Sequence, residues 1–144
     1  MKKNNPHPVP FVLADIILSQ FAILEENFDQ DKDFDLYIDV RFSYDAERKI
    51  IIPFVAVTYA QNNIPLLKIE SGNVFYFIPE FLEEIQRDRQ LIIPAGLARH
   101  LIMLTIGTLR GILFAKTEHT PFHHKVLPTI NVTELIQEDV VLDL

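Results

Sequence analysis

A regular alternation of apolar and polar side chains over residues 35–45 constrains the fold more than any other feature of the chain. The apolar set consists of Leu36, Ile38, Val40, Phe42 and Tyr44. Charged and hydroxyl side chains fill the positions between them, and Tyr37 is the one apolar exception. A period of two residues is typical of an antiparallel strand that rests one face on a core and turns the other to water. The chain is therefore expected to contain a sheet with a second layer packed on one side.

Three other segments are apolar on both of their faces. Residues 11–24 have few polar interruptions, residues 50–60 are rich in β-branched and aromatic side chains, and residues 65–78 end in an aromatic run. Such compositions favour strands. Together with residues 35–45 they predict four antiparallel strands that carry more apolar surface than a sheet covered on one side needs. A helix, a partner subunit or a ligand has to cover the remainder.

Turns and irregularities are expected at defined points of this sheet. Residues 45–48 and the pair Asn62-Asn63 separate the strands, and asparagine tolerates the left-handed backbone that hairpins need. Pro53 predicts a sheet edge or a bulge, because proline has no amide hydrogen to donate. Gly72 predicts a bulge or a sharp bend in the fourth strand.

A long apolar helix follows the four strands. Pro79 opens a short helical segment, a polar loop is expected over Gln86–Gln90, and Pro94 suits the first residue of the main helix. The main helix is apolar almost all round, which predicts burial on more than one side. Asn131, with a glutamate three positions on, resembles a capping residue for a short final helix over residues 132–139. These elements predict an α+β fold: a four-stranded antiparallel sheet packed against a long helix, with a short C-terminal helix.

Two glycines and two arginines stand out within the main helix. Gly107 and Gly111 lie four residues apart on one face. Glycine costs about 1 kcal/mol relative to alanine in a helix interior, but pairs at this spacing let two helices approach closely, a rule best established in membranes. We therefore expect both glycines at an oligomer interface. Arg99 and Arg110 either cover apolar surface while their charges reach water, or form ion pairs with strand carboxylates or a neighbouring subunit.

Length, charge and composition narrow the class of protein. The 144 residues suit a single domain, expected over residues 11–144, behind a stiff, extended arm of residues 1–10 that contains three prolines. A net charge of -7 disfavours nucleic-acid binding. The absence of cysteine excludes disulfides and thiolate chemistry and fits a reducing compartment. No run of signal-peptide type begins the chain, and the apolar stretch Leu101–Ala115 is shorter than the roughly 20 residues of a membrane span. We expect a cytoplasmic protein that does not insert into membranes.

No group of residues predicts catalysis. His119, His123 and His124 form a cluster, but Pro121 between them disrupts the helical spacing that would bring two imidazoles to one metal. Histidines at the surface or at an interface are the favoured interpretation, so no metal site is expected. The sequence has no nucleophile elbow, phosphate-binding loop or dinucleotide fingerprint. We therefore expect no catalytic residues and no cofactor, and the chain is not expected to be an enzyme.

The order of four strands, long helix, extended segment and short helix resembles that of the SecB export chaperone family over about residues 11–137. LLKIESGNVFYFI is similar to the family's fourth strand, with its apolar start, glycine and aromatic end. IPAGLARHLIMLTIGTLRG is similar to its helix, with Pro94, Ala98-Arg99 and Arg110-Gly111 in matching places. VLPTINVTEL resembles its run of leucine, proline, asparagine and leucine.

The resemblance implies an ATP-independent chaperone that holds extended, non-native polypeptides, including preproteins for export. It also implies a homo-oligomer, a dimer or a tetramer built as a dimer of dimers, and transfer of clients to the SecA motor. The sequence departs from the family where acidic residues contact SecA, because Gln20, Leu24 and Lys68 occupy those positions. Client binding therefore carries over better than transfer to SecA.

A groove for clients is expected along the fourth strand, lined by Leu67, Ile69, Phe75 and Phe77. Apolar burial is non-directional, so such a groove suits many client sequences. The alternative for these four residues is ordinary domain core, and an extended client can also pair with an exposed strand edge. Two other functions stay open. One is a non-catalytic adaptor or oligomerisation protein with one dedicated partner; the other is a binder of small apolar ligands that uses the aromatic end of the fourth strand.

Overall fold

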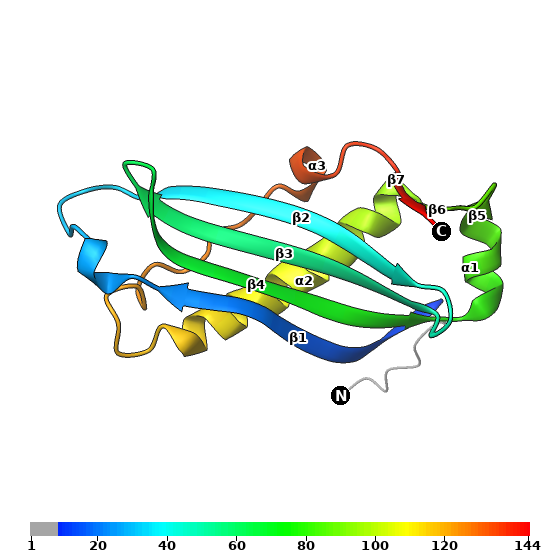
Figure 1. Cartoon of the computed structure of the whole chain (residues 1–144), viewed down its shortest axis with the longest axis horizontal. Coiled ribbons are helices and arrows are strands. Elements are labelled where there is room, and N and C mark those ends of the chain that lie inside the picture. The colour runs from blue at the N-terminus through cyan, green and yellow to red at the C-terminus, as the bar shows by residue number, and fades with distance from the viewer. Residues whose placement is uncertain (1–8) are drawn as a thin grey trace, which may run out of the picture.

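A four-stranded antiparallel sheet with a long helix across one face dominates the computed structural model, which describes residues 9–144 (Figure 1). Its strands are β1 (Phe11–Ile23), β2 (Asp35–Asp45), β3 (Ile50–Gln61) and β4 (Ile64–Phe77). Their spatial order is β1-β4-β3-β2, so β1 and β2 form the two edges. Tight turns join β2 to β3 and β3 to β4, and a longer connection containing η1 (Glu25–Asn27) links β1 to β2. The expected fold class is confirmed. Most of the expected N-terminal arm, residues 1–8, lies outside the described residues.

Helices and a second, smaller sheet complete the fold. They are α1 (Pro79–Ile85), β5 (Gln86–Arg87), β6 (Gln90–Ile93), α2 (Ala95–Lys116), α3 (Val132–Leu135) and β7 (Val140–Asp143). The polar loop expected over Gln86–Gln90 is a hairpin between β5 and β6, and β7 adds to β6. The final helix is present but ends at Leu135, four residues early, because the chain that follows turns to pair with β6. Local periodicity does not reveal that pairing, since its partner lies far away in the chain.

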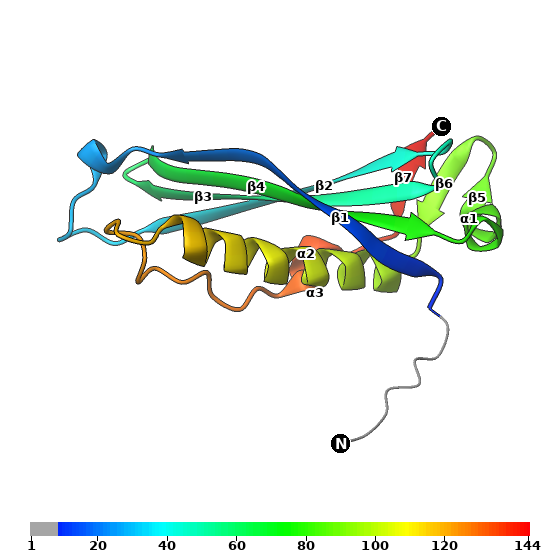
Figure 2. The same ribbon diagram turned by 90° about the horizontal axis from the view of Figure 1, so that it is seen from below.

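The two faces of the large sheet follow the alternation in β2. Side chains such as Val40 are half-buried toward α2, and their neighbours, such as Arg41, are exposed. Figure 2 shows α2 lying along one side of the sheet, which we call the helix face; the opposite side is the open face. Asn62 and Asn63 both have a positive φ, at 50° and 64°, as a two-residue hairpin turn requires.

Pro53 does not mark a sheet edge. β3 is an inner strand, with β2 on one side and β4 on the other, so the expected edge is wrong. The expected bulge is also wrong, because the register of β3 with β4 is the same before and after Pro53. The register of β3 with β2 is continuous through Pro53, which lies opposite Phe42. The ladder between β3 and β4 skips Ile52 and Pro53, so the missing amide hydrogen interrupts only the pairing with β4.

Gly72 does not form the expected bulge; instead, it leaves room for the ring of Phe54. It pairs in register with Ile17 of β1 and Phe54 of β3, and the shifts in register fall in β1 and near the end of β3 instead. A Cβ atom at Gly72 would lie 2.7 Å from two ring carbons of Phe54. The guanidinium carbon of Arg41 lies 3.7 Å from the centroid of the same ring. The glycine therefore makes room for a phenyl ring that also stacks on a cation.

The core lies between the helix face and α2, which packs on β3 and β4. The inward side of α2 consists of Ala98, Leu101, Ile102, Thr105, Ile106, Leu109 and Leu113. Its outer side is exposed, so the burial on more than one side expected from its composition is not met within one chain. Among the described residues, α2 is the one helix whose length and composition would also suit a membrane span. Its contact with the sheet accounts for the apolar inward side.

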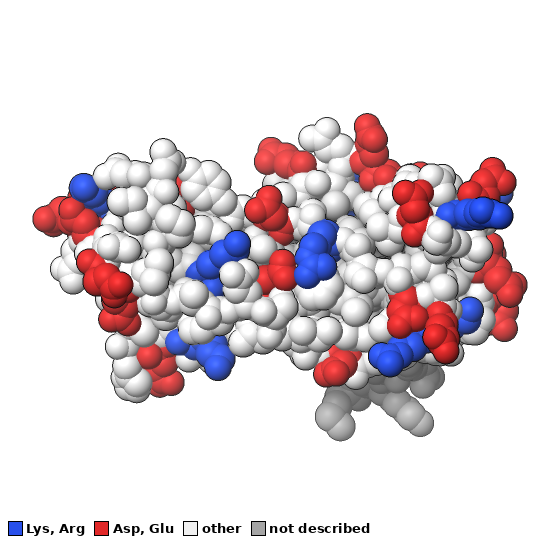
Figure 3. Space-filling view, in the orientation of Figure 1, with Lys and Arg blue, Asp and Glu red and all other residues white. Residues whose placement is uncertain are grey.

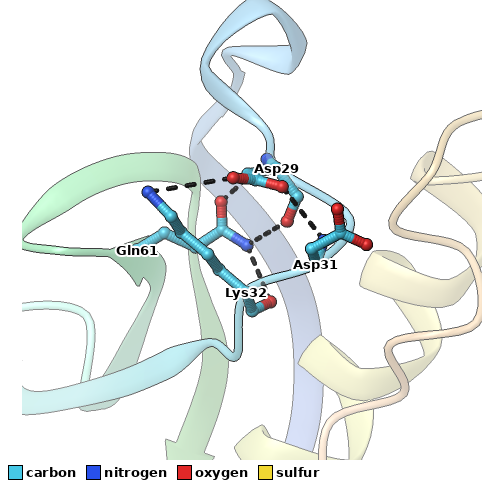
Figure 4. A network of polar contacts seen from close by, with 4 residues as sticks. All are labelled: Asp29, Asp31, Lys32 and Gln61. Carbon is cyan, nitrogen blue, oxygen red and sulfur yellow. Dashed lines mark hydrogen bonds and ion pairs between the residues drawn. The ribbon is translucent and has the colours of Figure 1, made fainter.

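One buried amide holds the acidic segment between β1 and β2. Gln61, 4% exposed at the end of β3, donates from Nε2 to the carbonyl oxygens of Asp29 (2.7 Å) and Lys32 (3.0 Å). Its Oε1 accepts from the backbone N–H of Asp29 at 2.9 Å (Figure 4). The rings of Phe28 and Phe34 stack beside this network with centroids 5.5 Å apart. A single polar side chain thus satisfies three backbone groups of the segment.

Replacing Gln61 by leucine is expected to lower the free energy of unfolding by about 1–3 kcal/mol, because three backbone groups lose their partner at a buried site. Urea denaturation followed by circular dichroism measures the change. Gln137→Leu is the matched control, since Gln137 is exposed and its hydrogen bond is local and 3.4 Å long. The control should change stability by no more than about 0.5 kcal/mol. A Gln61→Leu variant as stable as the unaltered chain would show that the segment is held by other contacts.

Candidate functional site

The four residues expected to line a client groove lie in the core. Leu67 and Phe75 are 1% exposed, and Ile69 and Phe77 are 0% exposed. The rings of Phe75 and Phe77 each pack on Phe11, with centroids 5.3 Å apart. The structure therefore shows the alternative interpretation, ordinary domain core, and none of the four side chains is open to a client in this conformation.

An exposed apolar surface runs along β1 instead. Leu13 is 50% exposed, Ile16 is 46% exposed and Leu18 is 38% exposed. Asp15 is the one charged side chain in this 13-residue strand. The register with β4 shifts after Leu13 and again after Leu18, and Figure 2 shows β1 bent and twisted along the edge of the sheet. Since β1 is an edge, its outer backbone groups have no strand partner among residues 9–144.

The opposite edge of the sheet is protected by charge. Asp35, Asp39, Arg41 and Asp45 all lie on β2. Charged side chains on an edge strand discourage the addition of another chain. Of the two edges, β1 is therefore the one suited to receive an extended polypeptide.

The outer face of α2 is a second exposed apolar surface. Met103 is 55% exposed, Phe114 is 51% exposed and Leu104 is 40% exposed. Gly107 and Gly111 are exposed on the same side, and a Cβ atom on either would meet nothing within 4 Å. No contact within residues 9–144 therefore requires these glycines. Their expected place at an oligomer interface stays a prediction.

An extended segment without helix or strand, which we call the strap (residues 125–131), runs beside α2. Arg110 of α2 fastens it. Its Nε donates to the carbonyl oxygen of Leu127 at 2.9 Å, and its Nη2 donates to that of Pro128 at 2.9 Å. The side chain of Leu127, 2% exposed, inserts into the core. The strap is thus held to α2 by its backbone and by one apolar anchor.

Two further side chains fix the chain on either side of these contacts. The hydroxyl of Tyr59 donates to the carbonyl oxygen of Lys125 at 3.0 Å. Burial raises the pKa of Tyr59, with an opposing effect of the Arg110 charge, so the hydroxyl keeps the proton that it donates. Arg99 donates from Nε to the carbonyl oxygen of Ile136 at 2.8 Å. Both arginines of α2 therefore bind backbone carbonyls rather than carboxylates, an alternative that the sequence did not suggest.

A pocket of about 200 Å³ opens between α2 and the chain that runs beside it. The lining residues of this α2–strap pocket are Met103, Ile106, Arg110, Thr129, Ile130 and Val132. Sequence reasoning missed the pocket, because its walls come from segments that only the fold brings together. The one feature of the sequence that points to this pocket is that α2 has apolar side chains on all its sides, including the side away from the sheet.

The open face carries a small polar network. Glu70 accepts hydrogen bonds from Ser19 Oγ at 2.8 Å and from Arg41 Nη2 at 3.0 Å. The bond from Arg41 lowers the pKa of Glu70 below its ordinary value, and the bond from Ser19 acts the same way against the opposing effect of burial. Figure 3, which views this face, shows wide uncharged areas around the scattered charges. Both donors bind the same oxygen, Oε1, so this carboxylate links β1, β4 and β2 on the open face and has a structural role.

The histidines gather beside the end of α2. The ring of His123 lies 4.4 Å from that of Phe114 and 5.5 Å from that of His124. His119 lies 4.0 Å from the carboxylate of Glu118 at the surface. Over residues 9–144, no group of three or more potential ligands lies close enough together to hold a metal ion.

Comparison with known proteins is informative at the level of the fold. No protein-family model and no curated protein matches this sequence. Among solved structures, the fold is similar to that of the Mycobacterium tuberculosis Rv1957 SecB-like chaperone, in complex with a ChAD peptide from the Rv1956 HigA1 antitoxin. The two chains are 13% identical, the match covers 84% of this chain and 91% of that chain, and the TM-score is 0.55. The chain therefore has a SecB-like fold.

Proposed function

We propose that this protein is an ATP-independent, non-catalytic chaperone that binds extended, non-native polypeptides, preproteins for export among them, in the cytoplasm. The exposed apolar edge at Leu13, Ile16 and Leu18 carries the proposal, because the core of the chain is complete without these side chains. Contiguous apolar surface of this kind marks a site that a partner covers. The SecB-like fold supports the same function at the level of architecture.

The proposed mode of binding is addition of the client to β1. An extended chain that adds to a free strand edge gains main-chain hydrogen bonds whatever its sequence. Leu13, Ile16 and Leu18 then contact its apolar side chains. The register shifts after Leu13 and Leu18 divide the edge into short runs, so a client pairs over a few residues at a time. Such short pairing favours broad and reversible binding.

The proposal includes a homo-oligomer, a dimer or a tetramer, with Gly107 and Gly111 at an interface. Transfer of clients to SecA is its weaker part. Gln20 pairs with Glu70 across β1 and β4, and Lys68 lies two residues before Glu70 in β4. Leu24, just after β1, is 41% exposed. None of the three positions inferred to contact SecA supplies the expected acid.

An adaptor with one dedicated partner is the second candidate. The solved structure of similar fold holds a peptide from an antitoxin, which is one defined partner. The same β1 edge would serve such a function. A binder of small apolar ligands is disfavoured, because the aromatic end of β4 is packed core. The α2–strap pocket, at about 200 Å³, is also smaller than the roughly 300–1,000 Å³ of ligand sites.

Without ATP, the protein is expected to suppress the aggregation of several unrelated unfolded proteins diluted into buffer, as followed by light scattering. The double variant Leu13→Ser/Ile16→Ser is expected to need about tenfold more protein for the same effect, because it removes two apolar contacts. It should remain folded, since both side chains are half exposed. Tyr37→Ser is the matched control: Tyr37 is 49% exposed on the opposite edge strand.

Each other outcome has a definite meaning. If Tyr37→Ser weakened the suppression of aggregation as much as Leu13→Ser/Ile16→Ser does, the binding site would not lie on β1. Failure to suppress any of the unfolded proteins would reject the general chaperone and leave the dedicated adaptor.

A further inference from the structure

A five-residue pattern repeats along β1, with units that begin at Phe11, Ile16 and Phe21. The first and third residues of each unit are large and apolar: Phe11 and Leu13, Ile16 and Leu18, Phe21 and Ile23. A small residue and a polar residue, Ala14-Asp15 or Ser19-Gln20, separate one unit from the next. The register with β4 shifts at the same two places, since Ala14 and Ser19 have no paired residue in β4. The bulges of the strand therefore recur with the period of its sequence.

The two bulges keep the six large apolar side chains on the helix face. In an unbroken strand, residues three positions apart, such as Leu13 and Ile16, point to opposite faces. The extra residue Ala14 removes this mismatch. Leu13 pairs with Phe75. Ile16 pairs with Asn73, two residues earlier in β4, and both partners are 1% exposed on the helix face. The bulge at the second junction acts in the same way for the third unit.

The same six residues direct their backbone N–H and C=O groups away from β4. At one end of β1, the N–H of Ile78 donates to the carbonyl oxygen of Pro10 at 2.9 Å. At the other end, the N–H of Leu24 donates to the carbonyl oxygen of Leu66 at 2.8 Å. Residues bonded to one neighbour alternate along an antiparallel strand, and each bulge shifts the count by one residue. Counting from either end gives the same result: the first and third residues of each unit face the free side of the edge.

A straight strand fits the free side of β1 as β4 fits the other side. The β4 partners of the six outward residues follow one another in steps of two residues, from Phe77 to Leu67. Each step covers about 6.8 Å. A client strand on the free side meets an outward residue at the same interval, so its register is kept from one unit to the next. Contact with all three units takes about 11 client residues, and a shorter client occupies one or two units.

We propose that this edge selects extended clients in which every second residue is apolar, and that these apolar residues also form the backbone hydrogen bonds to β1. The inference rests on the proposed function, in which the client adds to β1. Residues directly opposite each other in paired strands have their side chains on the same face. The client residues that bond Leu13, Ile16 and Leu18 therefore place their side chains beside these three, on the helix face.

The two faces of β1 suit different client side chains. On the helix face the exposed side chains are apolar, with Leu13 at 50% and Ile16 at 46%, so apolar client residues there remove apolar surface from water. On the open face Val12 is exposed, but Asp15 and Gln20 follow it at the two junctions and keep that side of the edge hydrated. A segment with the spacing of an amphipathic helix puts apolar residues on both faces when it is extended. Such a segment is the poorer fit.

Fluorescence anisotropy with a labelled 11-residue peptide, in which leucine alternates with threonine and lysine, tests the register. Methyl groups on the backbone nitrogens of two central leucines are expected to raise Kd by about tenfold or more, because each blocks an N–H that faces β1. Methyl groups on two central threonines should change Kd by about twofold or less, since those N–H groups face away from β1. The two methylated peptides are isomers, so their size and composition are matched.

The preference for alternation is measured with the same residues in a different order. A peptide whose leucines follow helical spacing is expected to bind about tenfold more weakly than the alternating peptide, because half of its leucines then face the open side.

A pair of neighbouring residues provides matched variants of the protein. Ile16→Ser is expected to raise Kd for the alternating peptide by about fivefold to tenfold, because Ile16 is 46% exposed on the helix face. Ile17→Ser should change it by about twofold or less, since Ile17 pairs with Gly72 and lies on the open face. Thermal unfolding checks that both variants are folded.

The other candidate for the free edge is β1 of a second copy, and Ile17→Cys tests for it. Two copies of β1 that pair antiparallel about Ile17 bring its Cα atoms to about 4.5 Å, a separation that a disulfide spans. The chain has no cysteine of its own, so any disulfide reports this contact. The variant is expected to stay reduced in the presence of saturating peptide. A disulfide between copies that forms despite the peptide would overturn the proposal.

The remaining outcomes separate this inference from the proposed function. Equal weakening by the two methylated peptides overturns the register and leaves client binding standing. Equal affinities for the alternating and rearranged peptides overturn the selectivity. If the alternating peptide does not bind while unfolded proteins are still kept from aggregating, clients bind elsewhere than at β1. A protein that neither binds the peptide nor suppresses aggregation overturns the proposed function as well.

Discussion

Replacing Phe75 or Phe77 by alanine is expected to lower the free energy of unfolding by about 3–5 kcal/mol in each case. The two rings are 1% and 0% exposed, and both pack on Phe11. Phe77 also stacks on Phe81 with centroids 5.8 Å apart. Truncation leaves a cavity that the neighbouring side chains fill only in part. Because whole domains are stable by only about 5–15 kcal/mol, each variant should lose a large share of its stability.

Urea denaturation followed by circular dichroism measures this effect, and Tyr76→Ala is the matched control. Tyr76 lies between the two phenylalanines in sequence but on the open face, where it is 40% exposed. Its replacement should cost about 1 kcal/mol or less. If Phe75→Ala kept its stability and lost client binding instead, the ring would line a groove, and its place in the core would be wrong.

Replacing Arg110 by methionine is expected to lower the free energy of unfolding by about 2–4 kcal/mol, because hydrogen bonds to charged groups contribute about 1.5–3 kcal/mol each. Two such bonds, to the carbonyl oxygens of Leu127 and Pro128, are lost. Methionine keeps much of the apolar stem, so the loss reports the bonds more than the packing. The strap should then separate from α2 more often, although Leu127 remains in the core.

Hydrogen exchange of the backbone amides of the strap tests this expectation. Exchange at Val126, Thr129 and Ile130 should be faster in Arg110→Met, while exchange within β3 should change only by the overall loss of stability. Arg48→Met is the control, since the Arg48 side chain is 79% exposed at a turn. Unchanged exchange in the strap would mean that the side chain of Leu127 and the Tyr59 bond suffice to hold it.

Local sequence patterns account for most of the large sheet and its helix. The alternation over residues 35–45 produced β2, and the three doubly apolar segments produced β1, β3 and β4. Asn62 and Asn63 take up the left-handed backbone expected of them. These features follow from side-chain periodicity and backbone preference, which act between residues close in the chain.

Local patterns did not account for contacts between distant segments. Pro53 predicts an edge or a bulge from its residue type alone, because no local pattern shows that β3 has a strand on each side. The polar loop at Gln86–Gln90 became a hairpin because β7 returns from the far end of the chain to complete a sheet. Arg99 and Arg110 donate to carbonyl oxygens of the chain between α2 and β7, and no pattern in the helix sequence reveals these partners.

The sequence by itself determined the strands, the long helix and the lack of any recognised catalytic motif, and only the tertiary structure decided which apolar residues are surface. Leu13 and Phe75 face each other across β1 and β4, both apolar and with the same periodicity. Phe75 is 1% exposed and Leu13 is 50% exposed. The difference arises because α2 packs mainly on β3 and β4 and covers β1 only at residues such as Phe11 and Phe21, so Leu13 stays open. Composition sets how much apolar surface a chain has, but the packing of distant elements decides where that surface stays open.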